Sequence, residues 1–193
     1  MKTPPLPVPP SPPSGRTVHH GRRMEVCVVA TAVGERDVIV HPGSVVVLPL
    51  LDATPGQETV VLIEQHRLAL GGTLVEVVAG TRDKAESIEA TALRELEEEA
   101  GYRAGVLTPL GAFYPAPGVS SELMWAFLAT NLEPIPPRPE PDEQIRVVVW
   151  PLRELEQAVA EGRIVDGKIL AMLSLYRLRR SPALFINGAM PAP

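Results

Sequence analysis

The sequence has few of the residues that disulfide-bonded, zinc-binding and membrane-spanning proteins require. It contains one cysteine, Cys27, so it can form neither an internal disulfide nor a cysteine-rich metal site. Its four histidines, His19, His20, His41 and His66, show no metal-ligand spacing. No apolar run reaches the roughly 20 residues of a transmembrane helix, and the N-terminus lacks the charged and then apolar order of a secretory signal. These absences predict a cytoplasmic protein with a buried, structural thiol.

The chain also lacks an excess of positive charge. Lysine and arginine total 18 against 23 aspartates and glutamates, which gives a net charge of −5. A mildly acidic chain argues against a broad nucleic-acid-binding surface. It can still bind a small phosphate ligand, because bound metal ions supply positive charge. The length of 193 residues and the 45% hydrophobic content fit one compact domain with additions.

Glutamate is abundant, and it is concentrated in one short segment. Residues 95–99 contain four glutamates, and three of them, Glu95, Glu98 and Glu99, fall within roughly a 100° arc of an α-helix. The apolar stripe of the same predicted helix consists of Ala85, Ile88, Ala92 and Leu96. The acids border this stripe, and a charge at the edge of a packed face needs a partner. Several hard oxygen ligands in one place indicate a site for Mg²⁺ and phosphate oxygens.

The helix also carries signals at both ends. Asp83 is predicted as its N-cap, with Glu86 three residues later as a variant of the capping box. Gly101 suits the position just after the last turn. An acidic, solvent-exposed helix face is the alternative interpretation of a generic glutamate run.

The wider pattern is G-x5-E-x7-R-E-U-x-E-E-x-G-U, where U is bulky or apolar, and residues 80–102 meet it at every fixed position. Seven fixed residues at roughly 7% usage each make a chance match about 10⁻⁶ or rarer. This pattern is the Nudix box, and the chain resembles the Nudix hydrolases. The resemblance implies an α/β protein, an α/β/α sandwich around a mixed β-sheet, and Mg²⁺-dependent hydrolysis of a nucleoside diphosphate linked to another group.

The chain is expected to have four parts. They are a proline-rich tail at 1–20, an N-terminal β-strand region at 21–55, the Nudix domain at 56–180 and a C-terminal tail at 181–193. The proline-rich segment is either a passive tail or a ligand for a proline-recognition module. Strands are predicted at 24–32, 37–40, 44–50, 60–64, 74–78, 107–113, 123–129 and 145–150, and further helices at 152–160 and 168–178.

Three segments outside the box resemble the ADP-ribose pyrophosphatase branch of the family. They are Gln65-His66-Arg67, the run from Leu74 to Gly80, and the run from Phe113 to Glu122. The branch commonly has E-L-P-A-G in the second segment, where this chain has Val78 in place of proline. The resemblance implies substrate-binding roles for Arg67, Glu76, Pro117, Gly118 and Glu122. Taken alone, these residues also fit a surface arginine, a strand end and an ordinary turn, and Tyr114 fits either the core or a base-stacking platform.

The resemblance also implies the catalytic residues. Glu95, Glu98 and Glu99, with the backbone carbonyl of Ala79, would bind Mg²⁺, with Mn²⁺ as an alternative ion. Arg94 would orient these carboxylates, and Glu86 would help to fix the start of the helix. A general base must take a proton from the attacking water. The candidates for it are Glu98 and three acids of a proline-rich loop: Glu140, Asp142 and Glu143, the last being nearest the following strand.

The leading hypothesis is hydrolysis of ADP-ribose to AMP and ribose 5-phosphate. The alternatives are another nucleoside diphosphate derivative, such as GDP-mannose or NADH, and a non-catalytic nucleotide-sugar sensor. Relatives in this branch form homodimers in which N-terminal strands help to build the neighbour's substrate site. The resemblance therefore implies a homodimer that binds a small nucleotide sugar, with neither nucleic acid nor membrane as a partner.

Overall fold

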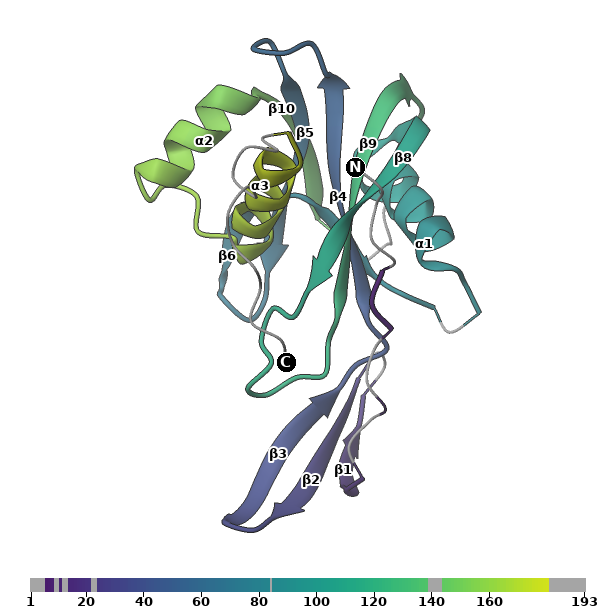
Figure 1. Cartoon of the computed structure of the whole chain (residues 1–193), viewed down its shortest axis with the longest axis vertical. Helices are drawn as coiled ribbons and strands as arrows, with labels where there is room; N and C mark the ends of the chain where they lie inside the picture. The colour runs from purple at the N-terminus through teal and green to yellow at the C-terminus, as the bar shows by residue number, and fades with distance from the viewer. Residues whose placement is uncertain are drawn as a thin grey trace, which may run out of the picture.

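The fold is organised around a mixed β-sheet with helices on both faces (Figure 1). The computed structural model describes residues 6–8, 11, 14–21, 24–83, 85–138 and 144–180. The main sheet has seven strands in this part of the chain: β4 (Ser44–Asp52), β5 (Thr59–Arg67), β6 (Gly72–Glu76), β7 (Val78–Thr81), β8 (Tyr102–Phe113), β9 (Met124–Pro134) and β10 (Ile145–Pro151). Five of them pair in the order β10-β5-β4-β9-β8. In addition, β6 pairs with β5 and β7 pairs with β4. Of these pairs, only β4 and β9 are parallel.

Strand β4 lies at the centre of this sheet, and its sequence explains its position. Its side chains alternate between the two faces. Val45 and Val47 pack in one hydrophobic cluster, while Val46 and Leu48 pack in another. Both faces of the strand are therefore covered, and a nearly continuous apolar run is what such a strand needs.

Each face of the sheet is covered by its own helices. One cluster includes Ala92 of α1 (Ile88–Glu95) and Leu96 of the turn that follows it. The other includes residues of α2 (Leu152–Ala160) and α3 (Gly167–Arg180). Figure 1 shows α1 on one side of the sheet and α2 and α3 on the other. The predicted α/β/α sandwich is thus confirmed.

The main sheet divides into two branches near its centre. Strands β4 and β5 pair only at Leu50–Val60 and Asp52–Thr59. Beyond that point β6 continues the pairing of β5, and β7 continues the pairing of β4. The single strand predicted at 74–78 is therefore wrong, because Val77 separates two strands that pair with different neighbours. The separation of the two branches creates room for a pocket.

A separate three-stranded sheet precedes the main sheet and extends away from it (Figure 1). It consists of β1 (Arg16–His20), β2 (Glu25–Thr31) and β3 (Gly34–Val40). The sequence did not predict β1, which lies within the proposed tail at 1–20. The sequence also grouped β4 with these strands, whereas its pairing places it in the main sheet. Ile39 connects the small sheet to the β8–β9 loop, since its N–H donates to Val119 O at 2.8 Å.

Part of the proline-rich segment contacts the main domain. Leu6 packs against the cluster under α1, and the Trp125 indole N–H donates to Pro7 O at 3.0 Å. Cys27 is buried, as predicted. The proposed C-terminal tail at 181–193 lies outside the described residues. Among the helices of the described part of the chain, none has the length and apolar character needed to cross a bilayer.

Candidate active site

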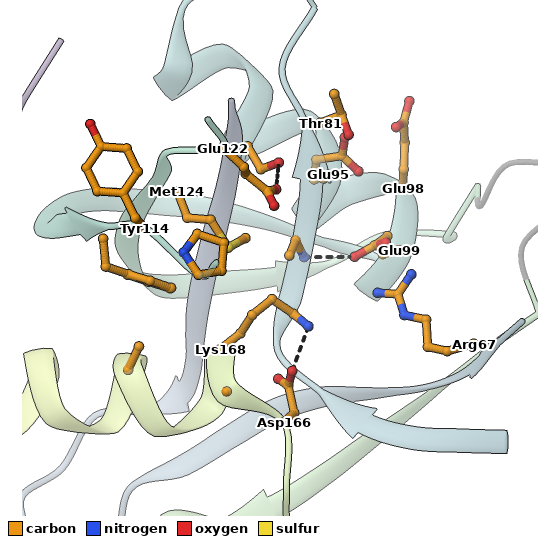
Figure 2. Close-up of a pocket in the computed structure, with 17 residues that line it drawn as sticks. Arg67, Thr81, Glu95, Glu98, Glu99, Tyr114, Glu122, Met124, Asp166 and Lys168 are labelled. Atoms are coloured by element: carbon orange, nitrogen blue, oxygen red, sulfur yellow. Dashed lines mark hydrogen bonds and ion pairs between the residues drawn. The ribbon is translucent and has the colours of Figure 1, made fainter. Parts of the chain in front are cut away.

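A pocket of about 680 Å³ opens where the two branches of the sheet separate. Its wall combines acids from the end of α1, cations from β5 and α3, and side chains of the β8–β9 loop (Figure 2). The polar and charged side chains that line it are Ser44, Arg67, Thr81, Glu95, Glu98, Glu99, Tyr114, Glu122, Asp166 and Lys168. The structure thus brings together residues that are far apart in the sequence.

The acidic helix begins later than predicted. Its N-cap is Ser87, whose hydroxyl accepts a hydrogen bond from the Ala90 N–H at 3.1 Å. The prediction of Asp83 as N-cap is wrong, because Asp83 O accepts a hydrogen bond from the Glu86 N–H at 3.0 Å and the helix starts only after Ser87. Glu86 instead accepts hydrogen bonds from the Thr91 hydroxyl and from Arg94. This residue therefore stabilises the first turns of the helix from their side.

The last turn of the helix, Leu96–Ala100, is a π-helix. It ends at Gly101, whose φ of 70° is in the left-handed region that glycine favours. A π-turn is wider than an α-turn and is frequent at functional sites. The arc was predicted from α-helical geometry, which residues 96–100 do not have, but all three acids line the pocket. Glu95 and Glu99 are buried, with exposed fractions of 8% and 3%, while Glu98 extends away from Glu99 (Figure 2).

The segment after β9 satisfies backbone carbonyls that this turn leaves unpaired. Ile135 N–H donates to Gly101 O at 2.8 Å, and Arg138 N–H donates to Glu98 O at 3.0 Å. A Cβ at Gly101 would stand 2.8 Å from Ile135 O, so glycine also permits this close approach. The chain that leads toward residues 139–143 is thereby fixed beside Glu98.

Strand β7 lies directly against the acids. The Ala79 N–H donates to Glu99 Oε2 at 3.2 Å. At Gly80, a Cβ would overlap the carboxyl group of Glu95. Only glycine lets the strand and this carboxylate come so close, which gives the first glycine of the box a steric role.

Arg94 pairs with the acids of its own helix. Its Nη1 lies 2.8 Å from Glu98 Oε2 and 2.9 Å from Glu95 Oε1, and its Nε lies 3.2 Å from Glu86 Oε1. Burial would lower the pKa of Arg94, but these hydrogen bonds and ion pairs outweigh it and raise that pKa. Arg94 is therefore a permanent cation among three carboxylates, a position compatible with the orienting role predicted for it.

A second charged group forms the wall toward α3. Arg67 donates to Glu76 through Nε at 2.7 Å and through Nη2 at 2.6 Å. Lys168 Nζ lies 2.7 Å from Glu76 Oε2 and 2.7 Å from Asp166 Oδ1. Burial would raise the pKa of Glu76, but Arg67 and Lys168 together hold it below its usual range. Asp166 and Lys168 were not predicted from the sequence, because isolated charged residues at the start of a helix are common.

The structure separates the five residues predicted to bind substrate. Arg67 and Glu122 line the pocket. Glu76 is only 1% exposed and faces its two cations instead of the pocket. Pro117 and Gly118 are exposed on the β8–β9 loop and do not line the pocket of their own chain. Glu122 is held in place by the Ser44 hydroxyl, which donates to its Oε1 at 2.5 Å.

The three acids proposed as the general base on a loop, Glu140, Asp142 and Glu143, lie outside the described residues. The described residues on either side of this segment contact elements that contribute residues to the pocket. Arg138 is bonded to the carbonyl of Glu98, and Ile145 pairs with Gln65 on β5.

The acids of the pocket are also a candidate metal site. Within the part of the chain that the structure describes, no three His, Cys, Asp or Glu side chains are already arranged around one point. The donors nevertheless suit a hard divalent cation, because Glu95, Glu98 and Glu99 supply carboxylate oxygens to one wall of the pocket. The Glu95 carboxyl occupies the space that a Cβ at Gly80 would fill, so the glycine permits this carboxylate to lie against β7. The donor set of this wall therefore fits a divalent cation.

Comparison with known proteins assigns the family. A family model described as the NUDIX domain matches residues 40–173. ADP-ribose pyrophosphatase of Bacillus subtilis (strain 168) is 35% identical over 149 residues, which cover 76% of this chain and 78% of that protein. GDP-mannose pyrophosphatase of Yersinia pestis (strain Pestoides F) is 36% identical over 137 residues, which cover 66% of this chain and 68% of that protein.

Other similar proteins extend this result. The methanol dehydrogenase activator of Bacillus methanolicus is 32% identical over 149 residues, 76% of this chain and 78% of that protein. The solved structure of an ADP compounds hydrolase matches the fold with a TM-score of 0.69 at 23% identity, covering 89% of this chain and 94% of that chain. The box, the fold and the family match agree, and the chain belongs to the Nudix family.

Proposed function

We propose that the protein hydrolyses the diphosphate bond of a nucleoside diphosphate sugar, and that it prefers ADP-ribose, which it converts to AMP and ribose 5-phosphate. The observation that carries this proposal is the pocket itself, where an acidic wall at Glu95 and Glu99 lies across from the cations Arg67 and Lys168. Its volume of about 680 Å³ is in the usual range for small-molecule sites. The similarity to an ADP-ribose pyrophosphatase supports the choice of substrate.

The acidic wall would bind the metal ion, and the cationic wall would bind phosphate oxygens of the substrate. Glu95, Glu98 and Glu99, with the Ala79 carbonyl, would hold Mg²⁺ or Mn²⁺. A divalent cation supplies polarisation of the diphosphate and activation of the attacking water. Arg67 uses two of its N–H groups on Glu76 and can direct the others to phosphate oxygens. Arg94 would keep Glu95 and Glu98 oriented while the substrate binds.

The proton of the attacking water needs an acceptor. We propose Glu143 or one of its loop neighbours, Glu140 and Asp142, with Glu98 as the alternative. In support of the loop, the residue before it is bonded to the carbonyl of Glu98. In support of Glu98, its carboxylate lines the pocket and has a neighbouring cation at 2.8 Å.

A product-resolved substrate panel tests the proposed reaction. With Mg²⁺, the purified protein is expected to convert ADP-ribose to AMP faster than it cleaves GDP-mannose or NADH, and chelation of the metal should abolish turnover. GDP-mannose is the second candidate because of the similarity to a GDP-mannose pyrophosphatase. If the protein cleaved GDP-mannose faster than ADP-ribose, GDP-mannose would be assigned as the preferred substrate. Tight binding of the panel without turnover would instead identify a nucleotide-sugar sensor.

We also infer that the protein acts in the cytoplasm as a homodimer. The sheet β1–β3 extends away from the main domain, and the nearby Pro117 and Gly118 do not line the pocket of their own chain. Both features leave these elements available to a neighbouring copy. Light scattering after size-exclusion chromatography is expected to give twice the chain mass of 20.8 kDa. A monomer at micromolar concentration would contradict the inference.

A further inference from the structure

Lys168 connects helix α3 to the buried carboxylate that holds Arg67. We propose that Lys168 is a positioning residue of the active site: it holds Glu76 from the side of α3, and Glu76 in turn keeps the Arg67 guanidinium turned into the pocket. The catalytic consequence rests on the proposed function, whereas the effect on Arg67 can be measured in the resting protein.

The first step is the geometry of Arg67. Its Nε and Nη2 donate to the two oxygens of Glu76, so the guanidinium is bound along one edge. Its opposite edge faces the pocket toward Glu99 (Figure 2). A paired edge fixes the plane of the group, and the remaining donors then have a defined direction for phosphate oxygens.

The second step is the balance of charge. Two cations, Arg67 and Lys168, share two carboxylates, Glu76 and Asp166, of which Glu76 is 1% and Asp166 7% exposed. The four formal charges sum to zero. A buried carboxylate without compensation is costly, so removing the lysine charge would leave Arg67 as the nearest cation for both acids. Arg67 would then turn away from the pocket toward Asp166.

The third step is the set of contacts that joins α3 to Glu76. Asp166 also accepts a hydrogen bond from the Ile169 N–H at 3.1 Å, so it is attached to the first turn of α3. Lys168 crosses from this turn to Glu76, at the end of β6, where the sheet divides. The helix on one face of the sheet thereby determines the position of a side chain that reaches the diphosphate pocket.

Kinetics of single and double variants test the inference. Lys168→Met is expected to lower kcat/KM for ADP-ribose by about tenfold to a hundredfold, mostly through KM, and Lys168→Arg should restore it to within about threefold. In a background of Arg67→Lys, which keeps the charge but loses the planar fork, Lys168→Met should cost less than about threefold. An equal loss in both backgrounds would show that Lys168 acts independently of Arg67 and would overturn the proposal.

A measurement without substrate separates this inference from the proposed function. In ¹H–¹⁵N spectra, the Nε–Hε signal of Arg67, assigned by its loss in Arg67→Lys, should be protected from solvent exchange. Lys168→Met should shift this signal and increase its exchange rate, and Lys168→Arg should reverse both changes. An Arg67 signal unchanged in Lys168→Met would refute the positioning role, even if no nucleoside diphosphate sugar is hydrolysed.

The exposed ion pair of Arg163 with Glu161 provides a matched control. Arg163→Met also removes one cation near the start of α3, but away from the pocket. It should leave kcat/KM and the Arg67 signal unchanged. Thermal unfolding of every variant shows which of them remain folded under the assay conditions, and only these are compared.

Discussion

Glu99→Gln is expected to lower kcat for ADP-ribose by about a hundredfold to a thousandfold while the protein stays folded. Glu99 is 3% exposed and accepts a hydrogen bond from the Ala79 N–H at 3.2 Å. Glutamine has the same shape and its carbonyl oxygen can accept the same bond, so the contact between the helix and β7 is retained. The substitution removes only the negative charge that would hold a divalent cation. Steady-state kinetics across a Mg²⁺ titration, with thermal unfolding in parallel, measure both effects.

Glu89→Gln is the matched control for this variant. Glu89 lies in the first turn of α1, on its exposed side, and does not line the pocket. Its replacement by glutamine therefore removes the same charge without changing the pocket. Its activity should equal that of the wild type. Unchanged activity of Glu99→Gln would refute the assignment of this residue to metal binding. In the same titration, saturating Mg²⁺ should partly rescue Glu98→Gln if Glu98 is a metal ligand, and should not rescue Glu143→Gln if Glu143 is the base.

Gly80→Ala is expected to lower both stability and activity. The added Cβ would overlap the Glu95 carboxyl group, so either β7 or this acid must move. Overpacking of this kind costs about 1–3 kcal/mol of unfolding free energy. A displacement of about 1 Å at reacting groups can cost about a hundredfold in rate. Urea denaturation and kcat/KM for ADP-ribose are the measurements.

Gly72→Ala provides the comparison for the alanine substitution. Gly72 starts β6, and the nearest atom to a Cβ there is Leu70 O at 4.0 Å, an ordinary contact. This variant should change the unfolding free energy by less than about 1 kcal/mol. If Gly80→Ala and Gly72→Ala had equal stability and equal kcat/KM, the close approach of β7 and Glu95 would have no functional importance.

Much of the fold could be predicted because its elements have strong local patterns. The apolar run of β4 predicted a buried strand, and α2 has the bounds that were predicted. The misses have specific causes. β1 has mostly exposed side chains and is defined by its pairing with β2. The break at Val77 depends on which neighbour each half of the strand finds, and sequence periodicity contains no such information.

The site could be predicted only in part, for a related reason. The acids of the box have a fixed spacing, so their sequence predicted that Glu95 and Glu99 would be close to one another. Serine and aspartate both suit an N-cap, so the sequence alone did not show that Ser87, and not Asp83, occupies this position. Lys168, which is paired with Asp166, meets Glu76 only after α3 has packed on the sheet. Contacts between elements distant in the sequence leave no pattern in a single chain.

The π-turn at Leu96–Ala100 makes the length of this segment as important as its composition. Such a turn is equivalent to one extra residue inserted in an α-helix. Deletion of a single codon between Glu95 and Gly101 could restore regular α-helical geometry, and it would rotate the residues before the deletion by about 100° relative to those after it. Glu95 and Glu99 would then no longer face the same pocket, even if the deleted residue were none of the acids that line it. Over evolution, we expect substitutions at the half-buried Glu97 to be tolerated where the loss of that residue is not.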